Sequence, residues 1–285
     1  MGREISSVGV VGLGTMGAGI AQVCVQAGFD TTGVEVSKEL CERARSTIDH
    51  YLSRGVEKGR LSSEEREAAL ARLTTSTSRD DLRDCDLVIE AIVEELEAKQ
   101  ELFRELDGIV SGDTILTTNT SALPVTEIGS AVERPERVVG LHFFNPAPVL
   151  QLVEVVRTDQ TSEEAHERAF EFAKALGKEP IRCNDTPGFV VNRILIPLLN
   201  DCVRVLDEAG VTPEDLDRAM RFGLNWPIGP CALLDLIGLD VHVHASDALQ
   251  EKLGEPRMAP PPRLVSMAES GRLGRKSGRG FFAYS

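Results

Sequence analysis

A short apolar run followed at once by three spaced glycines constrains the fold of this chain more than any other feature. Ser7–Val11 has no polar alternation, which is typical of a strand buried on both faces. The glycines that follow fit the pattern G-x-G-x-x-G, and the small residues at 18–27 predict a helix. An acidic residue, Glu35, comes 18 residues after the last of these glycines. A strand, a glycine loop, a helix and an acid in this order predict a dinucleotide-binding site.

Each part of this segment has a separate physical task. The first glycine permits a tight turn, the second lets the backbone approach a pyrophosphate, and the third lets the helix pack closely on the strand. We therefore expect the cofactor to contact Gly12, Gly14, Thr15, Met16 and Gly17. Glu35 would accept hydrogen bonds from ribose hydroxyls and repel a 2′-phosphate, which favours NAD over NADP. Lys38 supports the alternative, NADP, because its ammonium could pair with that phosphate.

The chain alternates strands and helices up to about residue 184 and is helical afterwards. Further strands are expected at 30–36, 86–91, 114–118, 137–141 and 152–156, with helices at 38–55 and 94–106. This alternation predicts an α/β fold with a Rossmann-type, doubly wound, mainly parallel sheet. Helices at 189–209, 230–236, 241–253 and 263–270, with one more after the cap at Thr212, predict an all-helical C-terminal domain. We expect an NAD-binding domain over 1–184, a linker over 185–190, and a helical substrate and dimerisation domain over 191–285.

Composition excludes several classes of partner. The chain has 285 residues and a net charge of −14, which argues against binding nucleic acid through a broad basic surface. No run approaches the roughly 20 apolar residues of a membrane span, and the N-terminus has no apolar signal-peptide core. The six cysteines are dispersed, which indicates a reducing compartment, so we expect a cytoplasmic protein. His242 and His244 fall in a predicted helix, where they do not share a face, so we expect a solvated pair and no metal site.

Four polar residues form a candidate catalytic set. His142 follows a predicted strand, at the edge where open α/β sheets bind ligands, and Glu154 lies 12 residues on in the next strand. A carboxylate beside an imidazole orients the ring and favours its protonated form, as a dehydrogenase needs for proton transfer. Ser121 follows the strand at 114–118, and Asn192 opens the long helix of the second half. Ser121 and Asn192 could instead be helix caps, so their spacing alone does not assign them.

Several segments, in order along the chain, together resemble one enzyme family. They are 12–21, 86–94, 119–121, 142–146, 152–156, 185–193, 227–230 and 274–282. In them the chain is similar to the L-3-hydroxyacyl-CoA dehydrogenases, in the branch of the short-chain 3-hydroxybutyryl-CoA dehydrogenases. The resemblance implies that His142 is the general base for oxidation and the acid for reduction, with Glu154 as its charge partner. It also implies that Ser121 holds the substrate oxygen and that Asn192 orients the histidine and the substrate carbonyl.

The same resemblance implies ligand contacts and an assembly. Beyond the glycine loop and Glu35, it implies cofactor contacts by Glu94, Lys99, Asn119, Asn145 and Lys276. For the phosphates of an acyl-CoA substrate we consider Arg54 and Lys58, although two charges at a helix end are equally consistent with solvation. The family also implies a homodimer through the C-terminal domain.

Two departures and two alternatives remain open. Glu35 stands where the family commonly has Asp, and Trp226 is either a wall of the acyl pocket or an ordinary core or interface aromatic. The substrate could instead be a hydroxyacyl group on an acyl carrier protein, or a free hydroxy acid or sugar acid. A nucleotide-binding protein without turnover, of the lens-crystallin kind, is the alternative outside enzymes, and the complete polar set argues against it.

Overall fold

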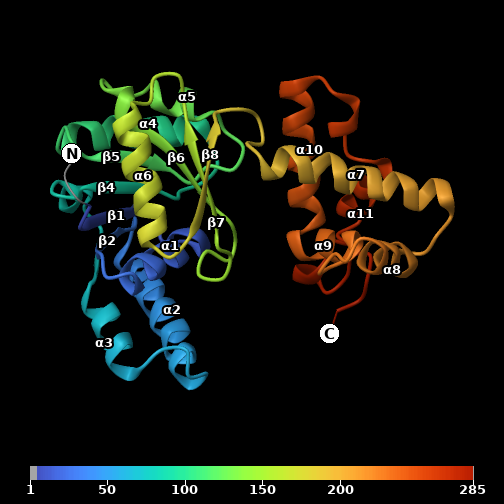
Figure 1. Ribbon diagram of the computed structural model, residues 1–285, viewed down its shortest axis with the longest axis horizontal. Helices are drawn as coiled ribbons and strands as arrows, with labels where there is room; N and C mark the ends of the chain where they lie inside the picture. The colour runs from blue at the N-terminus through green and yellow to red at the C-terminus, as the bar shows by residue number, and fades with distance from the viewer. Residues whose placement is uncertain (1–4, 285) are drawn as a thin grey trace. The chain divides into compact units, whose positions relative to one another are not determined.

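The computed structural model describes residues 5–284, which divide into two compact units. One unit ends at Thr186 and the other begins at Pro187, inside the linker expected from the sequence (Figure 1). The segment Met1–Glu4, which belongs to the N-terminus expected to lack a signal peptide, lies outside the described residues. No helix within residues 5–284 combines the length and apolar character needed to cross a membrane.

The first unit is built on one eight-stranded sheet. Its strands are β1 (Ser7–Val11), β2 (Asp30–Val34), β3 (Leu73–Ser76), β4 (Leu87–Glu90), β5 (Ile115–Thr118), β6 (Val138–Phe143), β7 (Leu152–Arg157) and β8 (Glu179–Asn184). Their order across the sheet is β3-β2-β1-β4-β5-β6-β7-β8. Among the described strands every neighbouring pair is parallel except β6 and β7. The predicted doubly wound, mainly parallel sheet is confirmed.

Helices cover both faces of this sheet. They are α1 (Thr15–Gln26), α2 (Lys38–Glu57), α3 (Ser63–Ala71), α4 (Leu96–Ile109), α5 (Val125–Gly129) and α6 (Glu163–Ala175), with the 3₁₀ turns η1 (Arg79–Leu82) and η2 (Pro135–Arg137). Buried residues of α1, α2 and α6 share one apolar core with Val8 and Val10 of β1. On the other face, Gly9 lies against Leu82 of η1. Because the strand order reverses between β1 and β4, the loops after these two strands leave room for a ligand.

One glycine of β2 is required by the way the loop after β1 packs on this strand. A Cβ at Gly33 of β2 would lie 2.8 Å from the Cδ atoms of Leu13. Leu13 belongs to the glycine loop after β1 and is buried in the core. The strand therefore omits a side chain at the point where the loop packs on it.

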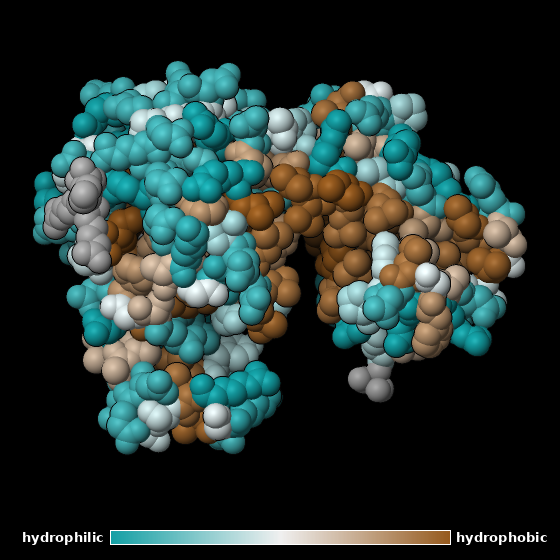
Figure 2. All heavy atoms as spheres, in the orientation of Figure 1, coloured by the Kyte–Doolittle hydropathy of each residue, from teal (hydrophilic) through white to brown (hydrophobic). Residues whose placement is uncertain are grey.

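The second unit is helical, as predicted. It contains α7 (Val191–Ala209), α8 (Pro213–Gly223), α9 (Pro230–Ile237), α10 (Leu239–Leu253) and α11 (Pro262–Glu269), with 3₁₀ turns η3 (Pro256–Met258) and η4 (Arg275–Ser277). Its largest core joins Leu199 and Val203 of α7 to Leu234 of α9 and Leu264 of α11. Apolar residues also gather on the surface over α7 (Figure 2). Large apolar side chains are exposed at Ile194, Val205, Phe222, Leu224, Leu236 and Val241.

The expected pair of solvated histidines is wrong for one member. His244 is exposed, but His242 is only 3% exposed and its Nε2 lies 2.9 Å from Oδ1 of Asn200. The amide of Asn200 donates in turn to the carbonyl oxygen of Met258 at 3.0 Å. Burial lowers the pKa of His242 to about 4, so the imidazole is neutral in the folded unit and donates to Asn200. Within residues 5–284 no group of three or more His, Cys, Asp or Glu residues could hold a metal ion.

Candidate active site

The two central residues of the candidate site lie opposite each other on neighbouring strands. The antiparallel register of β6 and β7 pairs His142 directly with Glu154. Nδ1 of His142 is 2.7 Å from Oε2 of Glu154, and both side chains are buried, at 6% and 0% exposure. A hydrogen bond from Nδ1 to a carboxylate keeps the proton on that nitrogen and leaves the lone pair on Nε2. The pair is therefore arranged to take up a proton at Nε2 and to stabilise the resulting imidazolium.

The glycine loop has the geometry that a dinucleotide requires. Gly12 has φ +87°, and a Cβ there would lie 2.7 Å from the carbonyl oxygen of Ala91. A Cβ at Gly17 would lie 1.7 Å from the carbonyl oxygen of Gly12, so the helix can approach the turn only without a side chain. A Cβ at Gly14 would meet no protein atom within 4 Å, so nothing inside the protein requires a glycine at this position. Gly14 also precedes α1 without a side-chain cap, which leaves the helix N-terminus open to an anion.

Glu35 lies where a ribose-binding acid is expected. It follows β2, and its Oε1 accepts a hydrogen bond from the backbone N–H of Leu13 at 3.0 Å. Its Oε2 accepts from the backbone N–H of Val36 at 2.8 Å. The extra methylene of Glu relative to Asp therefore still brings the carboxylate to the glycine loop. Each oxygen retains acceptor capacity for a ribose hydroxyl.

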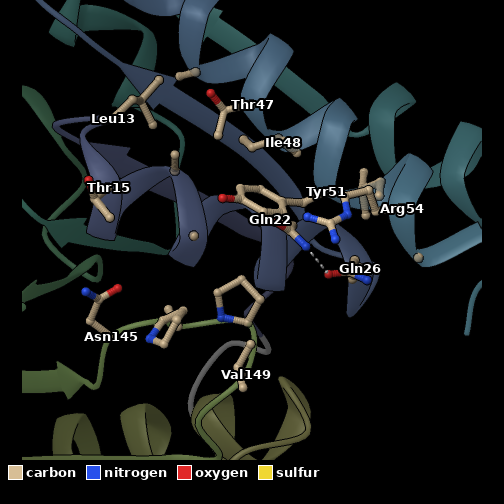
Figure 3. A pocket seen from close by; sticks show the side chains of 18 of the residues that line it. Leu13, Thr15, Gln22, Gln26, Thr47, Ile48, Tyr51, Arg54, Asn145 and Val149 are labelled. Carbon is tan, nitrogen blue, oxygen red and sulfur yellow. Dashed lines mark hydrogen bonds between the residues drawn. The ribbon is translucent and has the colours of Figure 1, made fainter. Parts of the chain in front are cut away.

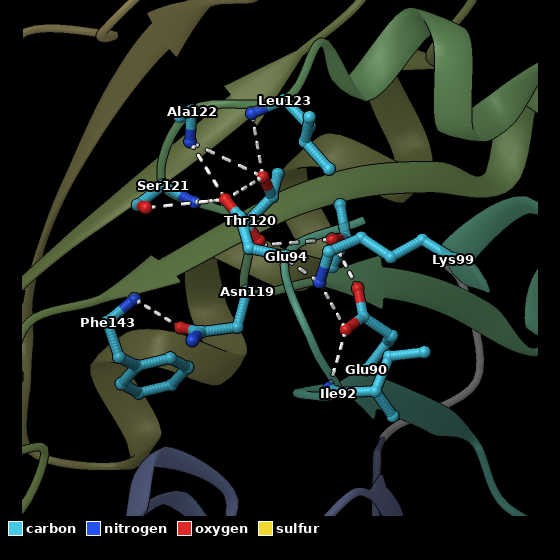
Figure 4. Close-up of polar contacts among 11 residues, drawn as sticks. Glu90, Ile92, Glu94, Lys99, Asn119, Thr120, Ser121, Ala122, Leu123 and Phe143 are labelled. Atoms are coloured by element: carbon cyan, nitrogen blue, oxygen red, sulfur yellow. Dashed lines mark hydrogen bonds and ion pairs between the residues drawn. The ribbon is translucent and has the colours of Figure 1, made fainter. Parts of the chain in front are cut away.

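A second polar cluster lies at the carboxyl ends of β4 and β5 (Figure 4). The ammonium of Lys99 is 2.5 Å from Oε1 of Glu90 and 3.3 Å from Oε2 of Glu94. Lys99 is only 1% exposed, so it is held between two carboxylates inside the protein. Glu90, which the sequence reasoning missed, is fully buried and also accepts from Oγ1 of Thr118 at 2.6 Å. The ion pair between Lys99 and Glu94 therefore helps to fix the position of the Glu94 carboxylate.

Glu94 in turn organises the turn that carries Ser121. Its Oε1 accepts from Oγ1 of Thr120 at 2.7 Å, and from the backbone N–H groups of Ser121 and Ala122 at 2.8 and 3.1 Å. The hydroxyl of Ser121 lies 3.3 Å from the same oxygen. Burial alone would raise the pKa of Glu94, but the charge of Lys99 and these hydrogen bonds outweigh it and lower the pKa. Glu94 is therefore ionised, and it fixes the backbone beside Ser121.

Asn119 connects this cluster to the histidine strand. Its Oδ1 accepts a hydrogen bond from the backbone N–H of Phe143, the residue after His142, at 2.9 Å. Because Oδ1 accepts this hydrogen bond, the amide nitrogen of Asn119 is the atom that can donate to a ligand. Figure 4 shows Asn119, Ser121 and Phe143 on adjacent segments. The structure thus brings Ser121 and Asn119 to the same edge of the sheet as the dyad, the pair formed by His142 and Glu154.

A pocket of about 770 Å³ opens beside the glycine loop (Figure 3). It is lined by the glycine loop and one face of α1 along its length, by one face of α2 and the turn that follows it, and by the loop from Asn145 to Val149. Four cationic side chains and no acidic one line it, and these are Arg43, Arg54, Lys58 and Arg60. Arg54 and Lys58 were expected from the sequence, whereas Arg43 and Arg60 were not. The spacing of Arg43, Thr47 and Tyr51, each four residues apart, was a signal, because it places them on the pocket-facing side of one helix.

Two predicted site residues belong to the second unit. Asn192 lies in the first turn of α7. Lys276 lies in η4, where its ammonium is 2.6 Å from Oδ1 of Asp240. The C-terminal segment that carries Lys276 is fixed by Asp235, which accepts from the backbone N–H groups of Phe281 and Phe282 at 2.9 Å. The ligand contacts expected of Asn192 and Lys276 stay predictions.

Comparisons with known proteins agree over the whole chain. Residues 7–186 match the model of the 3-hydroxyacyl-CoA dehydrogenase NAD-binding domain, and residues 188–284 match that of the C-terminal domain of the same family. A 3-hydroxybutyryl-CoA dehydrogenase of Mycobacterium tuberculosis is 46% identical over 100% of both chains. The mitochondrial hydroxyacyl-coenzyme A dehydrogenase of Homo sapiens is 40% identical, over 98% of this chain and 91% of its own. A crystal structure of (S)-3-hydroxybutyryl-CoA dehydrogenase from Ralstonia eutropha is 41% identical, with a TM-score of 0.96 over 99% of this chain and 100% of that chain. This chain therefore belongs to the 3-hydroxyacyl-CoA dehydrogenase family.

Proposed function

We propose that this enzyme interconverts a short-chain L-3-hydroxyacyl-CoA, foremost 3-hydroxybutyryl-CoA, and the corresponding 3-oxoacyl-CoA. The observation that carries the proposal is the buried contact of 2.7 Å between His142 and Glu154. When bound, NAD supplies the hydride acceptor for oxidation and, in its reduced form, the hydride donor for reduction. The chain supplies the proton transfer and the positions of the reacting groups.

His142 and Glu154 share the proton work. Nε2 of His142 takes the proton of the 3-hydroxyl group during oxidation and returns it to the 3-oxo oxygen during reduction. Glu154 keeps the ring in one tautomer and stabilises the imidazolium while the proton resides there. Ser121 holds the substrate oxygen, and Asn192 of the second unit orients the histidine and the thioester carbonyl.

The residues present fit an NAD-type dinucleotide. The open space at Gly14 and the uncapped start of α1 would hold the pyrophosphate. Glu35 would accept from the adenosine ribose, which supports NAD over NADP, while Lys38 remains the argument for NADP. Asn119, Asn145 and Lys276 complete the expected contacts. We assign Glu94 a direct contact and Lys99 an indirect one, because Lys99 is enclosed by Glu90 and Glu94.

The cationic pocket supports coenzyme A as the carrier. Four cations without an acid in the wall form a local anion site in a chain whose net charge is −14. Coenzyme A brings several phosphates, whereas a small free hydroxy acid brings one carboxylate, so the pocket favours the larger ligand. The opposite wall, Pro146 to Val149, is mainly apolar and suits the uncharged arm of the thioester.

We also propose a homodimer formed through the second unit. Several large apolar side chains are exposed on the second unit, among them Ile194, Phe222 and Leu224, and contiguous apolar patches on a surface mark contacts with other protein chains. A twofold contact of this kind buries the same patch on both copies. Light scattering should give twice the mass of the chain.

A His142→Gln variant tests the proposed reaction. Turnover of acetoacetyl-CoA with NADH should fall by at least about 10²-fold, the usual scale of general acid–base catalysis. NADH binding, followed by its fluorescence, should stay at the wild-type value. His244→Gln is the matched control, because His244 is an exposed histidine of the second unit. Undiminished turnover in His142→Gln would remove the histidine from the mechanism.

A substrate panel tests the carrier. The wild-type enzyme should saturate with acetoacetyl-CoA at micromolar concentration. It should need far higher concentrations of the same acyl group on N-acetylcysteamine, on an acyl carrier protein, or as the free acid. Saturation by acetoacetyl-CoA only at millimolar concentration contradicts the coenzyme A assignment.

A further inference from the structure

A buried ammonium outside the dyad holds the loop that joins its two strands. Lys178 directly precedes β8 and is only 8% exposed. Its Nζ donates to the carbonyl oxygen of Ala147 at 2.5 Å and to that of Leu150 at 2.9 Å. Both acceptors are backbone carbonyls, so the charge is not neutralised by these two partners. Burial accordingly lowers the pKa of Lys178.

The same loop packs closely against α1 at Gly19. A Cβ built on Gly19 would lie 3.2 Å from Cδ of Pro148 and 3.4 Å from Cβ of Ala147. Inside the loop, the backbone N–H groups of Val149 and Leu150 both donate to the carbonyl oxygen of Pro146. The loop is therefore a compact turn seated between Gly19 and Lys178.

This turn forms one wall of the cationic pocket. Asn145, Pro148 and Val149 line the pocket opposite α2, as Figure 3 shows for Asn145 and Val149. The dyad, by contrast, is fixed by the pairing of β6 and β7. A displaced turn would change the shape of the pocket while the strand pairing keeps His142 and Glu154 together.

A buried charge at this position costs free energy that an apolar side chain of similar size would not cost. Burying an ammonium without a carboxylate is unfavourable, and a methionine would fill a similar volume without that cost. What the ammonium adds is a directed hold on two carbonyl oxygens of one turn. Precise seating of that turn is the property that distinguishes Lys178 from an apolar residue.

We propose that Lys178 is a positioning residue for acyl-CoA binding, which acts by holding the turn from Pro146 to Leu150 in place as a wall of the pocket. The inference rests on the proposed function, because it takes coenzyme A to be the ligand of this pocket. It concerns the binding step, and it assigns Lys178 no contact with the reacting atoms.

Lys178→Met tests the inference. The KM for acetoacetyl-CoA should rise at least about 10-fold, while kcat stays within about 3-fold, because the wall moves and the dyad does not. The Kd for coenzyme A, measured by calorimetry, should rise in parallel, which gives a readout independent of turnover. Lys174→Met is the matched control, since Lys174 is exposed and pairs with Glu171. Its kinetic constants should equal those of the wild type.

Gly19→Ala displaces the same turn without touching Lys178. Alanine favours a helix over glycine, and Pro148 has to move by only a few tenths of an ångström, so this variant should still fold. The added methyl group should nonetheless press on Pro148 and raise the KM for acetoacetyl-CoA by at least about 3-fold, with kcat unchanged. If Lys178→Met does not fold, Gly19→Ala decides the question.

The outcomes separate the two proposals. A wild-type protein that neither binds coenzyme A nor reduces acetoacetyl-CoA overturns the proposed function and this inference together. The inference alone is overturned if the wild type does both and the KM of folded Lys178→Met for acetoacetyl-CoA is within 2-fold of the wild-type KM. A fall in kcat at constant KM also overturns it, because the lysine would then act on the dyad.

Discussion

Protonation of His242 should make the stability of the second unit depend on pH, and a His242→Gln variant should remove that dependence. In the unfolded chain this histidine has an ordinary pKa of about 6.5, whereas burial lowers it to about 4 in the folded unit. Between these values the unfolded chain binds a proton that the folded unit does not. Stability is therefore lost as the pH falls from about 6.5 towards 4.

The size of the effect follows from the two pKa values. Between pH 7 and pH 5, linkage gives a loss of about 2 kcal/mol in the free energy of unfolding from this one residue. Glutamine keeps a donor for Oδ1 of Asn200 but binds no proton in this range. The variant will be less stable than the wild type at pH 7, but its own loss on going to pH 5 should be smaller by about 2 kcal/mol.

Urea unfolding followed by tryptophan fluorescence measures this quantity in the relevant unit. Trp226 is the only tryptophan of the chain and lies in the second unit, so its emission reports the unfolding of that unit. Protein concentration must be constant throughout, because association changes apparent stability. His244→Gln, an exposed histidine two positions along the same helix, should retain the wild-type difference between the two pH values. Equal losses in the wild type and His242→Gln would refute the linkage argument.

Four further substitutions test the site directly. In steady-state kinetics, Glu154→Gln should lower kcat by about 10²- to 10⁴-fold with little change in the KM for NADH, because the carboxylate orients and stabilises the imidazolium. A change in the KM for NADH without a fall in kcat would contradict this role. Glu35→Ala should raise the KM for NADH and lower the ratio of kcat/KM for NADH to kcat/KM for NADPH. An unchanged ratio would show that this acid does not select the cofactor. Arg54→Ala and Lys58→Ala should each raise the KM for acetoacetyl-CoA by about 10-fold but leave the KM for the N-acetylcysteamine thioester unchanged. Equal increases in the KM for both thioesters would show that the two cations do not bind the phosphates of coenzyme A.

The parts of the structure that depend on local pattern were predictable from the sequence. The glycine loop combines three conformational requirements within a few residues, so its place after β1 and before α1 followed directly. Glu154 was placed beside His142 because a return strand brings residues 12 apart in the sequence opposite each other. The change from alternating elements to helices near residue 186 was equally visible, because turn residues cluster there.

Elements whose residues look polar were missed. The edge strand β8, with the sequence Glu-Pro-Ile-Arg-Cys-Asn, contains Pro180, and β3 has three hydroxyl residues in four. Both lie at the ends of the sheet, where hydrogen bonds to one neighbour and partial exposure tolerate such residues. The helix α6 was also missed, although Ser162 followed by two glutamates was a usable start signal.

Buried charges and polar side chains were the least predictable part of the molecule. The enclosure of Lys99 by Glu90 and Glu94, and the burial of His242 against Asn200, depend on contacts between separate elements. No spacing along the chain specifies them. A titratable residue in an amphipathic helix looks the same in the sequence whether it is solvated or enclosed.

The pairing of His142 with Glu154 across β6 and β7 has a consequence for how such an enzyme can diversify. Both residues lie inside the hydrogen-bonded ladder, whereas the turn that shapes the binding pocket connects the two strands outside it. Exchanges or insertions in the turn can therefore alter which ligand is accepted without shifting the register that holds the acid–base pair. Grafting turns of different length onto this one sheet offers a way to change substrate choice while retaining the same chemistry.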